Sequence, residues 1–292
     1  MKSLHKREKK GKSSMPKYKK FIGLGIAGNF ALHLEQAGEA EDFKNIITAD
    51  EAAPKGMFPS YLPKKIVGAK EQLHVYPFSS SNIKHPQNGL NIQAEPEVGL
   101  ICKLEYHIGK LHKIIPTHFG AYNDCSIRVA GASKISDKKN WGVDSKGISD
   151  TLIPIDKFED GGNIHNYSIC SFLKRDGELH EYGEDVKVSG YSYFNDKLTD
   201  WMTDQINTQE DGDPLEPIGD YLFKCDNPHE AIISIGATRY TEYGEKTFLQ
   251  VGDEIIIVVY NHIKLSFDEV KKDIKNHSYN EKDMSILVQI VG

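Results

Sequence analysis

Short apolar runs bounded by Gly, Asp and Asn recur along the chain, and such runs are typical of buried β-strands. One segment differs, because residues 196–207 carry their apolar side chains at helical spacing and predict a helix. A second helix is expected from Asn29 to about Gly38. Strands and helices do not alternate regularly, which argues against a doubly wound parallel sheet. The strands are expected at residues 21–27, 98–106, 168–174, 230–237 and 253–260.

Two acidic residues, Glu95 and Glu97, lie one residue apart at the start of an expected strand. Because side chains alternate along a strand, both carboxylates are expected on one face, a few ångströms apart. Two buried like charges repel, and a hard divalent cation with a third carboxylate would relieve that repulsion. Pro96 donates no ladder hydrogen bond, so we expect this stretch on an edge strand or at a bulge. For such a pair taken alone, a solvated strand face is the alternative.

The composition fits a globular protein with one elaborate core or two modest ones, since 39% of its 292 residues are hydrophobic. No apolar run is long enough to cross a membrane, and no segment resembles a signal peptide. We therefore expect a soluble, cytoplasmic protein without a membrane partner. The four cysteines, at positions 102, 125, 170 and 225, form no Cys-x-x-Cys pair, so reduced and mostly buried thiols are expected.

The first segment of the chain, residues 1–20, is strongly basic, although the net charge of the whole chain is −6. A basic tail can dock on nucleic acid. This one has no apolar face and no aromatic residues placed for stacking on bases. We expect a disordered extension and no nucleic-acid partner.

A series of further motifs occurs in one order along the chain and resembles the fumarylacetoacetate hydrolase superfamily. The stretch around Asp124, Asn-Asp-x-Ser-x-Arg, is the most specific of them. The motifs are Asn29-Phe30-Ala31-Leu32-His33, Glu95-x-Glu97, Asn123-Asp124-x-Ser126-x-Arg128, Lys138 nine residues before Gly147, Asp176-Gly177-Glu178, and Gly236 followed by Phe248-Leu249-Gln250-Val251-Gly252-Asp253.

The resemblance implies an α+β, β-rich fold, namely a mixed β-sandwich roll with a small N-terminal lid region. It implies a lid over residues 21–88 and a catalytic domain over residues 89–292. Family members commonly form dimers, so a homodimer is expected.

The resemblance also implies a set of functional residues. The metal ligands would be Glu95, Glu97 and Asp124, and the ion would be Mg²⁺, with Mn²⁺ or Ca²⁺ as alternatives. The catalytic residues would be His33 on the lid, Glu35 and Lys138, and the substrate-binding residues Arg128 and Thr238. For Arg128, an ion pair that holds Asp124 is the alternative role, and for Lys138 a place in a solvated loop.

Several positions depart from the family pattern. Gln36 stands where the family usually has the acid that follows the lid histidine, and Glu35 is the neighbouring candidate for that acid. Ala237 replaces a hydroxyl residue, so that Thr238 would have to supply the hydroxyl one position later. Charged residues at 144–147 replace an apolar turn. These differences indicate a divergent branch and leave the substrate open.

The chemistry that suits such a site is metal-assisted formation of an enolate from a small oxo acid. We expect hydrolysis of a carbon–carbon bond in an acylpyruvate or related β-diketo acid. Decarboxylation of an oxaloacetate-like acid and isomerisation or hydration of a 2-oxo acid use the same enolate and remain alternatives. A metal-binding homologue without this activity is a further alternative.

Overall fold

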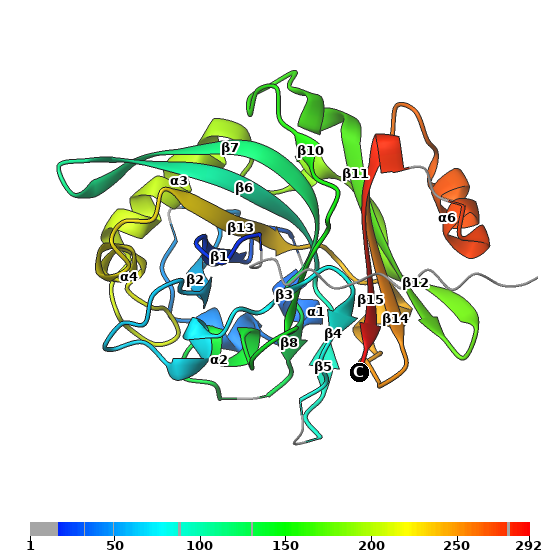
Figure 1. Cartoon of the computed structure of the whole chain (residues 1–292), viewed down its shortest axis with the longest axis horizontal. Coiled ribbons are helices and arrows are strands. Elements are labelled where there is room, and N and C mark those ends of the chain that lie inside the picture. The colour runs from blue at the N-terminus through cyan, green and yellow to red at the C-terminus, as the bar shows by residue number, and fades with distance from the viewer. Residues whose placement is uncertain (1–16, 32, 49, 87–88, 130, 279–280) are drawn as a thin grey trace, which may run out of the picture.

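Two mixed β-sheets packed face to face form the body of the protein (Figure 1). The computed structural model describes residues 17–292 except 32, 49, 87–88, 130 and 279–280.

The larger sheet has the order β2 (Gly56–Tyr61), β1 (Ile22–Ala27), β13 (Glu230–Ala237), β6 (Pro96–His107), β7 (Lys110–Asn123), β9 (Lys146–Ile148) and β3 (Phe78–Ser79), with β10 (Ile153–Pro154) paired to β7. The smaller sheet has the order β12 (Glu178–Lys187), β11 (Tyr167–Arg175), β14 (Glu254–Asn261), β15 (Met284–Val291) and β4 (Asn82–Ile83), and β5 (Ile92–Gln93) pairs with β8 (Ser126–Ile127).

The helices lie around the two sheets, and α3 packs against β7 and β2. The α-helices are α1 (His33–Gln36), α2 (Ser136–Lys139), α3 (Asn195–Thr208), α4 (Ile218–Lys224), α5 (Glu242–Glu245) and α6 (Phe267–Asn276). The 3₁₀ helices are η1 (Ala40–Phe43), η2 (Glu71–His74), η3 (Asn163–Asn166), η4 (Val188–Gly190) and η5 (Glu281–Asp283).

Strand β14 corresponds to the expected strand at residues 253–260, which is apolar at nearly every position. Alternate residues of a strand point to opposite faces of the sheet. Ile255 and Ile257 join the main core between the sheets, whereas Ile256 and Val258 join a second cluster on the outer face. A helix covers that outer face, so both faces of β14 are buried.

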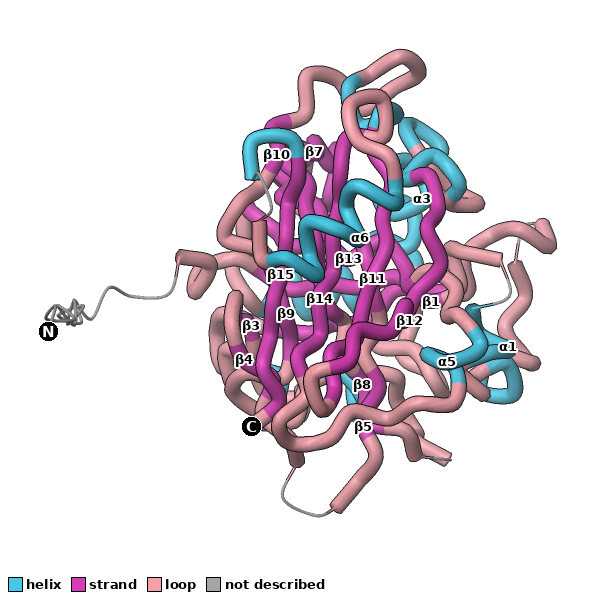
Figure 2. The backbone as a smooth tube through the Cα atoms, turned by 90° about the vertical axis from the view of Figure 1, so that its right-hand side faces the viewer, coloured by secondary structure: helices cyan, strands magenta, loops and turns pink. Residues whose placement is uncertain are grey.

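Helix α6 is the element that covers the outer face of the smaller sheet (Figure 2). Val270 and Ile274, four residues apart, point into the sheet. A capping box between Ser266 and Glu269 begins the helix. Helix α6 was not among the expected elements, although its capping box and its apolar spacing are both visible in the sequence.

The five expected strands are present, and the expected helix at 196–207 corresponds to α3. The other expected helix is reduced to the single turn α1. Asp176 and Gly177, both with positive φ, form the tight turn between β11 and β12. The four cysteines are buried free thiols, as expected. Of the basic segment 1–20, residues 1–16 lie outside the described part of the chain, and none of the described helices is long and apolar enough to span a bilayer.

The expectation of an edge strand around Pro96 is wrong. Strand β6 lies in the interior of the larger sheet, between β13 and β7. Pro96 is tolerated there because it is the first residue of the strand. A bulge is present on the neighbouring strand, where the register between β13 and β6 shifts between Ser234 and Ala237. Gly236, at φ 113°, lies within that shift.

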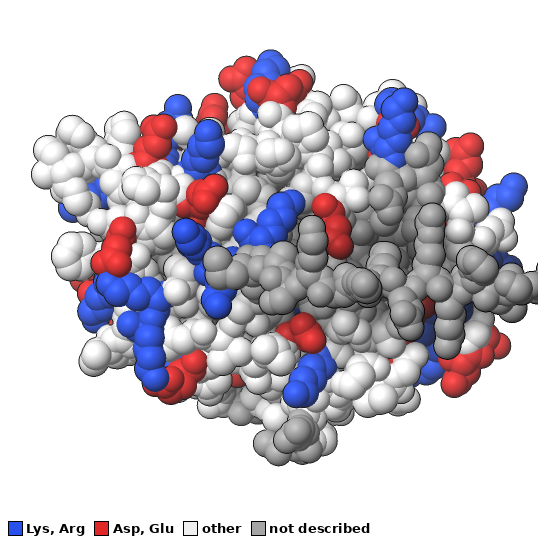
Figure 3. Space-filling model, in the orientation of Figure 1, with Lys and Arg blue, Asp and Glu red and all other residues white. Residues whose placement is uncertain are grey.

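Charged side chains of both signs are interspersed on the face of the molecule seen in Figure 3. One exposed pair of the chain is Lys64 with Asp226, at 2.7 Å. Pairs of this kind contribute little to stability because water screens them.

Gly147 provides a test of the packing between the two sheets. A Cβ atom at this position would lie 2.3 Å from Oε1 of Gln289, whose side chain is held by Asn123 and by the carbonyl of Asn82. Because that side chain cannot move aside freely, Gly147→Ala should lower the free energy of unfolding by about 1–3 kcal/mol. Urea denaturation measures the change. Gly212→Ala is the control, since the added Cβ meets nothing within 4 Å, and equal losses in the two variants would contradict the prediction.

Candidate metal centre and active site

Glu95, Glu97 and Asp124 converge in the interior of the protein. One ligand oxygen from each lies within 4.8 Å of the others, and all three residues are buried. Oxygens so placed can surround one divalent ion at about 2.0–2.6 Å. The three residues, called the acidic triad below, are therefore a candidate divalent metal site.

Two backbone features position the acidic triad. The bulge in β13 turns the amide of Gly236 toward Glu97, and this amide donates to Glu97 Oε2 at 2.8 Å. Asn123 ends β7, and its side-chain oxygen accepts from the amide of Glu95 at 3.2 Å. The amide of Asp124 donates to the carbonyl of Glu95 at 3.0 Å. These bonds bring the Asn-Asp segment to the start of β6.

Cationic side chains contact two of the three carboxylates. Lys139 Nζ lies 2.6 Å from Glu95 Oε2 and 2.8 Å from Asp124 Oδ2. Lys146 Nζ lies 2.9 Å from Asp124 Oδ1, and Arg128 lies 2.9 Å from Glu95 Oε1. Both Asp124 oxygens and Glu95 Oε1 nevertheless lack a hydrogen bond of good geometry. Their lone pairs remain suited to a metal ion, so the donor set fits a hard divalent cation.

The electrostatics of the acidic triad differ from one carboxylate to the next. Burial raises the pKa of Glu97 well above its usual range, and the charges of Asp124 and Glu95 raise it further. Burial also opposes ionisation of Glu95, but Lys139 and Arg128 outweigh that effect and hold its pKa below the usual range. Glu97 is thus the carboxylate that a metal ion would stabilise most in its charged form.

His33 lies in α1 with its ring buried. Its Nδ1 is 2.9 Å from the carbonyl of Thr238, and a carbonyl can only accept, so Nδ1 carries the proton. Nε2 is buried and has no hydrogen-bond partner. Burial lowers the pKa of His33, which keeps the ring neutral, and the charge of Glu95 partly opposes this shift. A neutral ring with a free Nε2 lone pair can accept a proton.

Glu35 does not join His33 in the interior. The two residues are two positions apart on one helical turn, so they point in nearly opposite directions, and Glu35 is exposed. Gln36 is placed on the inner side, where its amide bonds to the backbone N and O of Tyr240 at 2.9 and 3.2 Å. Gln36 therefore anchors α1. The expected partnership of His33 with Glu35 is not formed.

Glu39, which was not expected from the sequence, is a second buried acid near His33, in addition to Glu95. Glu39 is 6% exposed and accepts from Arg128 at 2.8 Å and from Lys138 at 2.9 Å. Burial raises the pKa of Glu39, but Lys139 and Arg128 outweigh this and lower it. No local pattern marks Glu39, because it reaches the site from the loop that follows α1.

Arg128 contacts Glu95 and Glu39, and not Asp124 as one interpretation of the sequence had it. Its Nε donates to Gln93 at 2.7 Å, and Nη2 donates to the Tyr240 hydroxyl at 3.0 Å. The guanidinium is thus held in place on several sides. The ion pairs with Glu39 and Glu95 are the main contacts of Arg128 in the structure.

Thr238 and Lys138, the other two residues predicted from the sequence, are both buried. The Thr238 hydroxyl donates to the carbonyl of Pro96 at 3.2 Å. Lys138 forms an ion pair with Glu39, so it does not lie in a solvated loop. The lysine that contacts the acidic triad is its neighbour Lys139. We use the name charge cluster for Glu39, Glu95, Glu97, Asp124, Arg128, Lys138, Lys139 and Lys146.

Helix α2 carries two lysines of the charge cluster, and Glu216 is buried beside the start of that helix. The Ser136 hydroxyl and amide face the Glu216 carboxylate, but neither contact has hydrogen-bond geometry. Burial raises the pKa of Glu216 to about 7. Lys134, which opposes this shift, bonds to the carbonyl of Leu215 at 2.8 Å and ties the two segments together.

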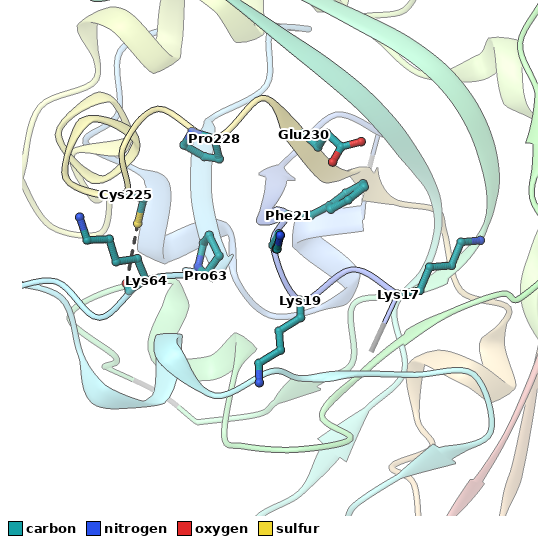
Figure 4. A pocket seen from close by; sticks show the side chains of 9 residues that line it. Lys17, Lys19, Phe21, Pro63, Lys64, Cys225, Pro228 and Glu230 are labelled. Carbon is teal, nitrogen blue, oxygen red and sulfur yellow. Dashed lines mark hydrogen bonds between the residues drawn. The ribbon is translucent and has the colours of Figure 1, made fainter. Parts of the chain in front are cut away.

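One pocket reaches the charge cluster from outside. It has a volume of about 410 Å³, and its lining includes Glu39, Arg128 and Lys138. A larger pocket of about 660 Å³, lined by Lys17, Phe21, Lys64 and Cys225 among others, contains no residue of the charge cluster (Figure 4). The smaller pocket is therefore the relevant opening.

Comparison with known proteins gives a family and a fold. The model of a family of unknown function, DUF5718, matches residues 39–291. The chain belongs to DUF5718. The matched region of this DUF5718 chain contains the whole charge cluster and begins beyond His33. Its sequence matches none of the curated proteins with which it was compared.

Solved structures resemble the DUF5718 chain at low sequence identity. Cg1458 with an inhibitor is 16% identical, with a TM-score of 0.52, over 92% of this chain and 76% of that one. 2-Keto-3-deoxy-D-arabinonate dehydratase with magnesium and 2,5-dioxopentanoate is 13% identical, with a TM-score of 0.47, over 92% and 72%. A Yersinia pestis CO92 protein assigned to the fumarylacetoacetate hydrolase family is 14% identical, with a TM-score of 0.45, over 82% and 88%. The likeness to Cg1458 shows the fold alone. The fold class expected from the sequence is confirmed, and the expected resemblance is shown at the level of the fold.

The pKa of Glu216 predicts how the stability of the DUF5718 chain depends on pH. A carboxyl whose pKa is higher in the folded than in the unfolded state binds its proton more tightly when folded. Its contribution is complete below pH 4.5 and is lost as the pH rises through about 7. Glu216→Gln stays neutral, so its stability relative to the unmodified chain should increase between pH 5 and pH 8 by up to about 3 kcal/mol.

Urea denaturation of both proteins at several pH values measures this difference. Glu210→Gln, which changes an exposed glutamate in the same region, is the control. A stability difference that does not change with pH would contradict a raised pKa at Glu216.

Proposed function

We propose that this chain is a divalent-metal-dependent enzyme that hydrolyses a carbon–carbon bond in an acylpyruvate or related β-diketo acid. The observation that carries the proposal is the convergence of the buried acidic triad in a fold of this type. Glu95, Glu97 and Asp124 would hold the ion, with Mg²⁺ as the first candidate and Mn²⁺ or Ca²⁺ as alternatives. When bound, the metal supplies Lewis-acid polarisation of a substrate carbonyl.

His33 is the residue that we propose as the base. Its protonated Nδ1 is fixed by the Thr238 carbonyl, and its free Nε2 is buried on the inner side of α1. Neutral imidazole in this tautomer can take a proton from water or from a substrate carbon. Glu35 is exposed and drops out of this role.

Cations of the charge cluster would bind the anionic parts of the substrate. Arg128 and Lys138 line the pocket of about 410 Å³, from which an oxo acid would approach the acidic triad. Lys139 lies one step further in, at Glu95 and Asp124. We therefore assign to Lys139 the electrostatic role that the sequence gave to Lys138. The Thr238 hydroxyl keeps acceptor capacity for a substrate donor.

A second reaction class, isomerisation or hydration of a 2-oxo acid, is favoured by one observation. The partner of His33 Nδ1 is a backbone carbonyl and not a carboxylate, so the imidazolium formed on proton uptake has no directly bonded counter-charge. That arrangement suits reversible proton transfer at carbon as well as activation of water. Decarboxylation of an oxaloacetate-like acid would use the same residues.

Metal binding is the first test of this proposal. We expect one Mn²⁺ or Mg²⁺ per chain, and Glu97→Gln should weaken binding by at least the roughly 10–100-fold that loss of an outer-shell partner costs. Among the described residues none forms an ion pair with Glu97, and Gln can still accept from the Gly236 amide, so this variant should remain folded. Titration calorimetry measures the affinity. Glu35→Gln is the control, and equal affinity in both variants would remove Glu97 from the site.

Turnover is the second test. The substrates are short acylpyruvates and oxaloacetate with added Mg²⁺, followed by loss of enol absorbance. His33→Ala should lower turnover by roughly 10²–10⁴-fold, since a positioned proton-transfer group contributes about that factor. His118→Ala, an exposed histidine, is the control. If the unmodified protein binds metal but turns over none of these substrates, the hydrolase proposal is lost and the non-catalytic homologue takes its place.

A further inference from the structure

The acidic triad is already crowded with protein cations. Each of the four oxygens of Glu95 and Asp124 has a cationic nitrogen at 2.6–2.9 Å. These nitrogens come from Arg128, Lys139 and Lys146. Three positive charges thus lie against two carboxylates, so no metal is needed to neutralise them. Glu97 alone in the acidic triad is without an ion pair among the described residues.

Lys139 is the cation that lies between two of the candidate metal ligands. Its Nζ bridges Glu95 and Asp124, at 2.6 and 2.8 Å, and so lies between two of the three ligands. An ion bound at about 2.0–2.6 Å to both carboxylates needs oxygens that the ammonium group now contacts. Like charges held this close repel strongly in a buried site. Lys139 and a divalent ion therefore exclude one another from the space between Glu95 and Asp124.

Lys146 differs from Lys139 because it has nowhere to move. Its side chain is 0% exposed, and Nζ also donates to the carbonyl of Cys125 at 2.7 Å. The residue belongs to β9, which is paired on both sides, with β7 and with β3. Lys139 is also buried, but it ends the short helix α2, and the polar contacts of its Nζ among the described residues are to carboxylates. Lys146 is thus held by the backbone as well as by Asp124, whereas Lys139 is held by the two carboxylates.

We propose that Lys139 takes the place of the divalent ion in the metal-free protein, and that Lys146 permanently weakens metal binding through its contact with Asp124. This inference rests on the proposed function only in taking the acidic triad as the metal site. It predicts that this chain binds divalent ions more weakly than its three carboxylates alone would. It also predicts that metal binding requires Lys139 to leave Glu95 and Asp124.

The test is Mn²⁺ affinity, measured by titration calorimetry and by the paramagnetic resonance signal of free Mn²⁺. Lys139→Gln keeps an amide donor for the carboxylates but removes the charge. We expect it to bind Mn²⁺ at least about tenfold more tightly than the unmodified chain, since removal of a neighbouring like charge shifts such equilibria by a factor of ten or more. Lys146→Met should also bind more tightly. Lys138→Gln is the control, because Lys138 pairs with Glu39 and not with the acidic triad.

Thermal unfolding gives a second measurement, with and without metal. Without metal, Lys139→Gln should melt below the unmodified chain, because Glu95 and Asp124 lose a counter-charge. Added Mn²⁺ should raise its melting temperature more than that of the Lys138→Gln control. If Lys139→Gln binds Mn²⁺ no more tightly than the unmodified chain and gains no more stability from it, the proposal is overturned.

The outcomes separate this inference from the proposed function. If Lys139→Gln binds Mn²⁺ and the unmodified chain binds none, the mutual exclusion of Lys139 and the metal ion is supported. In that case the natural protein does not depend on a metal. Metal-dependent turnover in the unmodified chain with no gain in Lys139→Gln overturns the exclusion and leaves the proposed function standing. Absence of Mn²⁺ binding in every variant overturns the exclusion as well.

Discussion

The charge balance around Asp124 is the constraint on which the rest of the interior depends. A buried ion that lacks a partner costs several kcal/mol, so each member of the charge cluster requires the others to be in place. Those members come from distant parts of the chain, namely the loop after α1, strand β6, the segment after β7, helix α2 and strand β9. The sheets, α2 and the N-terminal region must therefore assemble together. Pairing of Lys139 with Glu95 and Asp124 ties α2 to the β6–β7 hairpin.

The sequence predicted those parts of the fold and the site that follow from local geometry. Apolar runs marked the central strands because strands buried on both faces, such as β14, have no polar positions to interrupt them. Glu95 and Glu97 were found because period-2 alternation alone places them on one side of a strand. Asp124 came from the resemblance. By contrast, Lys139 and Lys146 meet the acidic triad, and Glu39 meets Arg128 and Lys138, only through tertiary packing, and no local spacing in the sequence connects them.

Two of the errors have instructive causes. Glu35 was expected as the acid because it stands beside Gln36, where the family has that acid, but a separation of two residues on a helical turn directs the side chains of His33 and Glu35 apart. Pro96 was taken as evidence for an edge strand or a bulge. The edge strand is wrong because a proline at the first position of a strand removes no bond that the sheet needs, whereas a bulge does lie opposite this stretch, on β13. In both cases the position of the residue within its element was overlooked, namely its direction on the helical turn for Glu35 and its place in the strand for Pro96.

The docking of α1 bears on how any substrate reaches the interior. His33 and Gln36 hold this turn to the backbone of Thr238 and Tyr240 through three hydrogen bonds. At about 1 kcal/mol net for each bond, these three bonds contribute about 3 kcal/mol to the docking of α1, and the burial of Leu34 and the ion pairs of Glu39 add to it. In the proposed reaction His33 needs the tautomer that Thr238 fixes, so the closed arrangement is the competent one. A substrate that enters through the pocket beside Glu39, Arg128 and Lys138 avoids that cost, which is why these three residues and not α1 should control access.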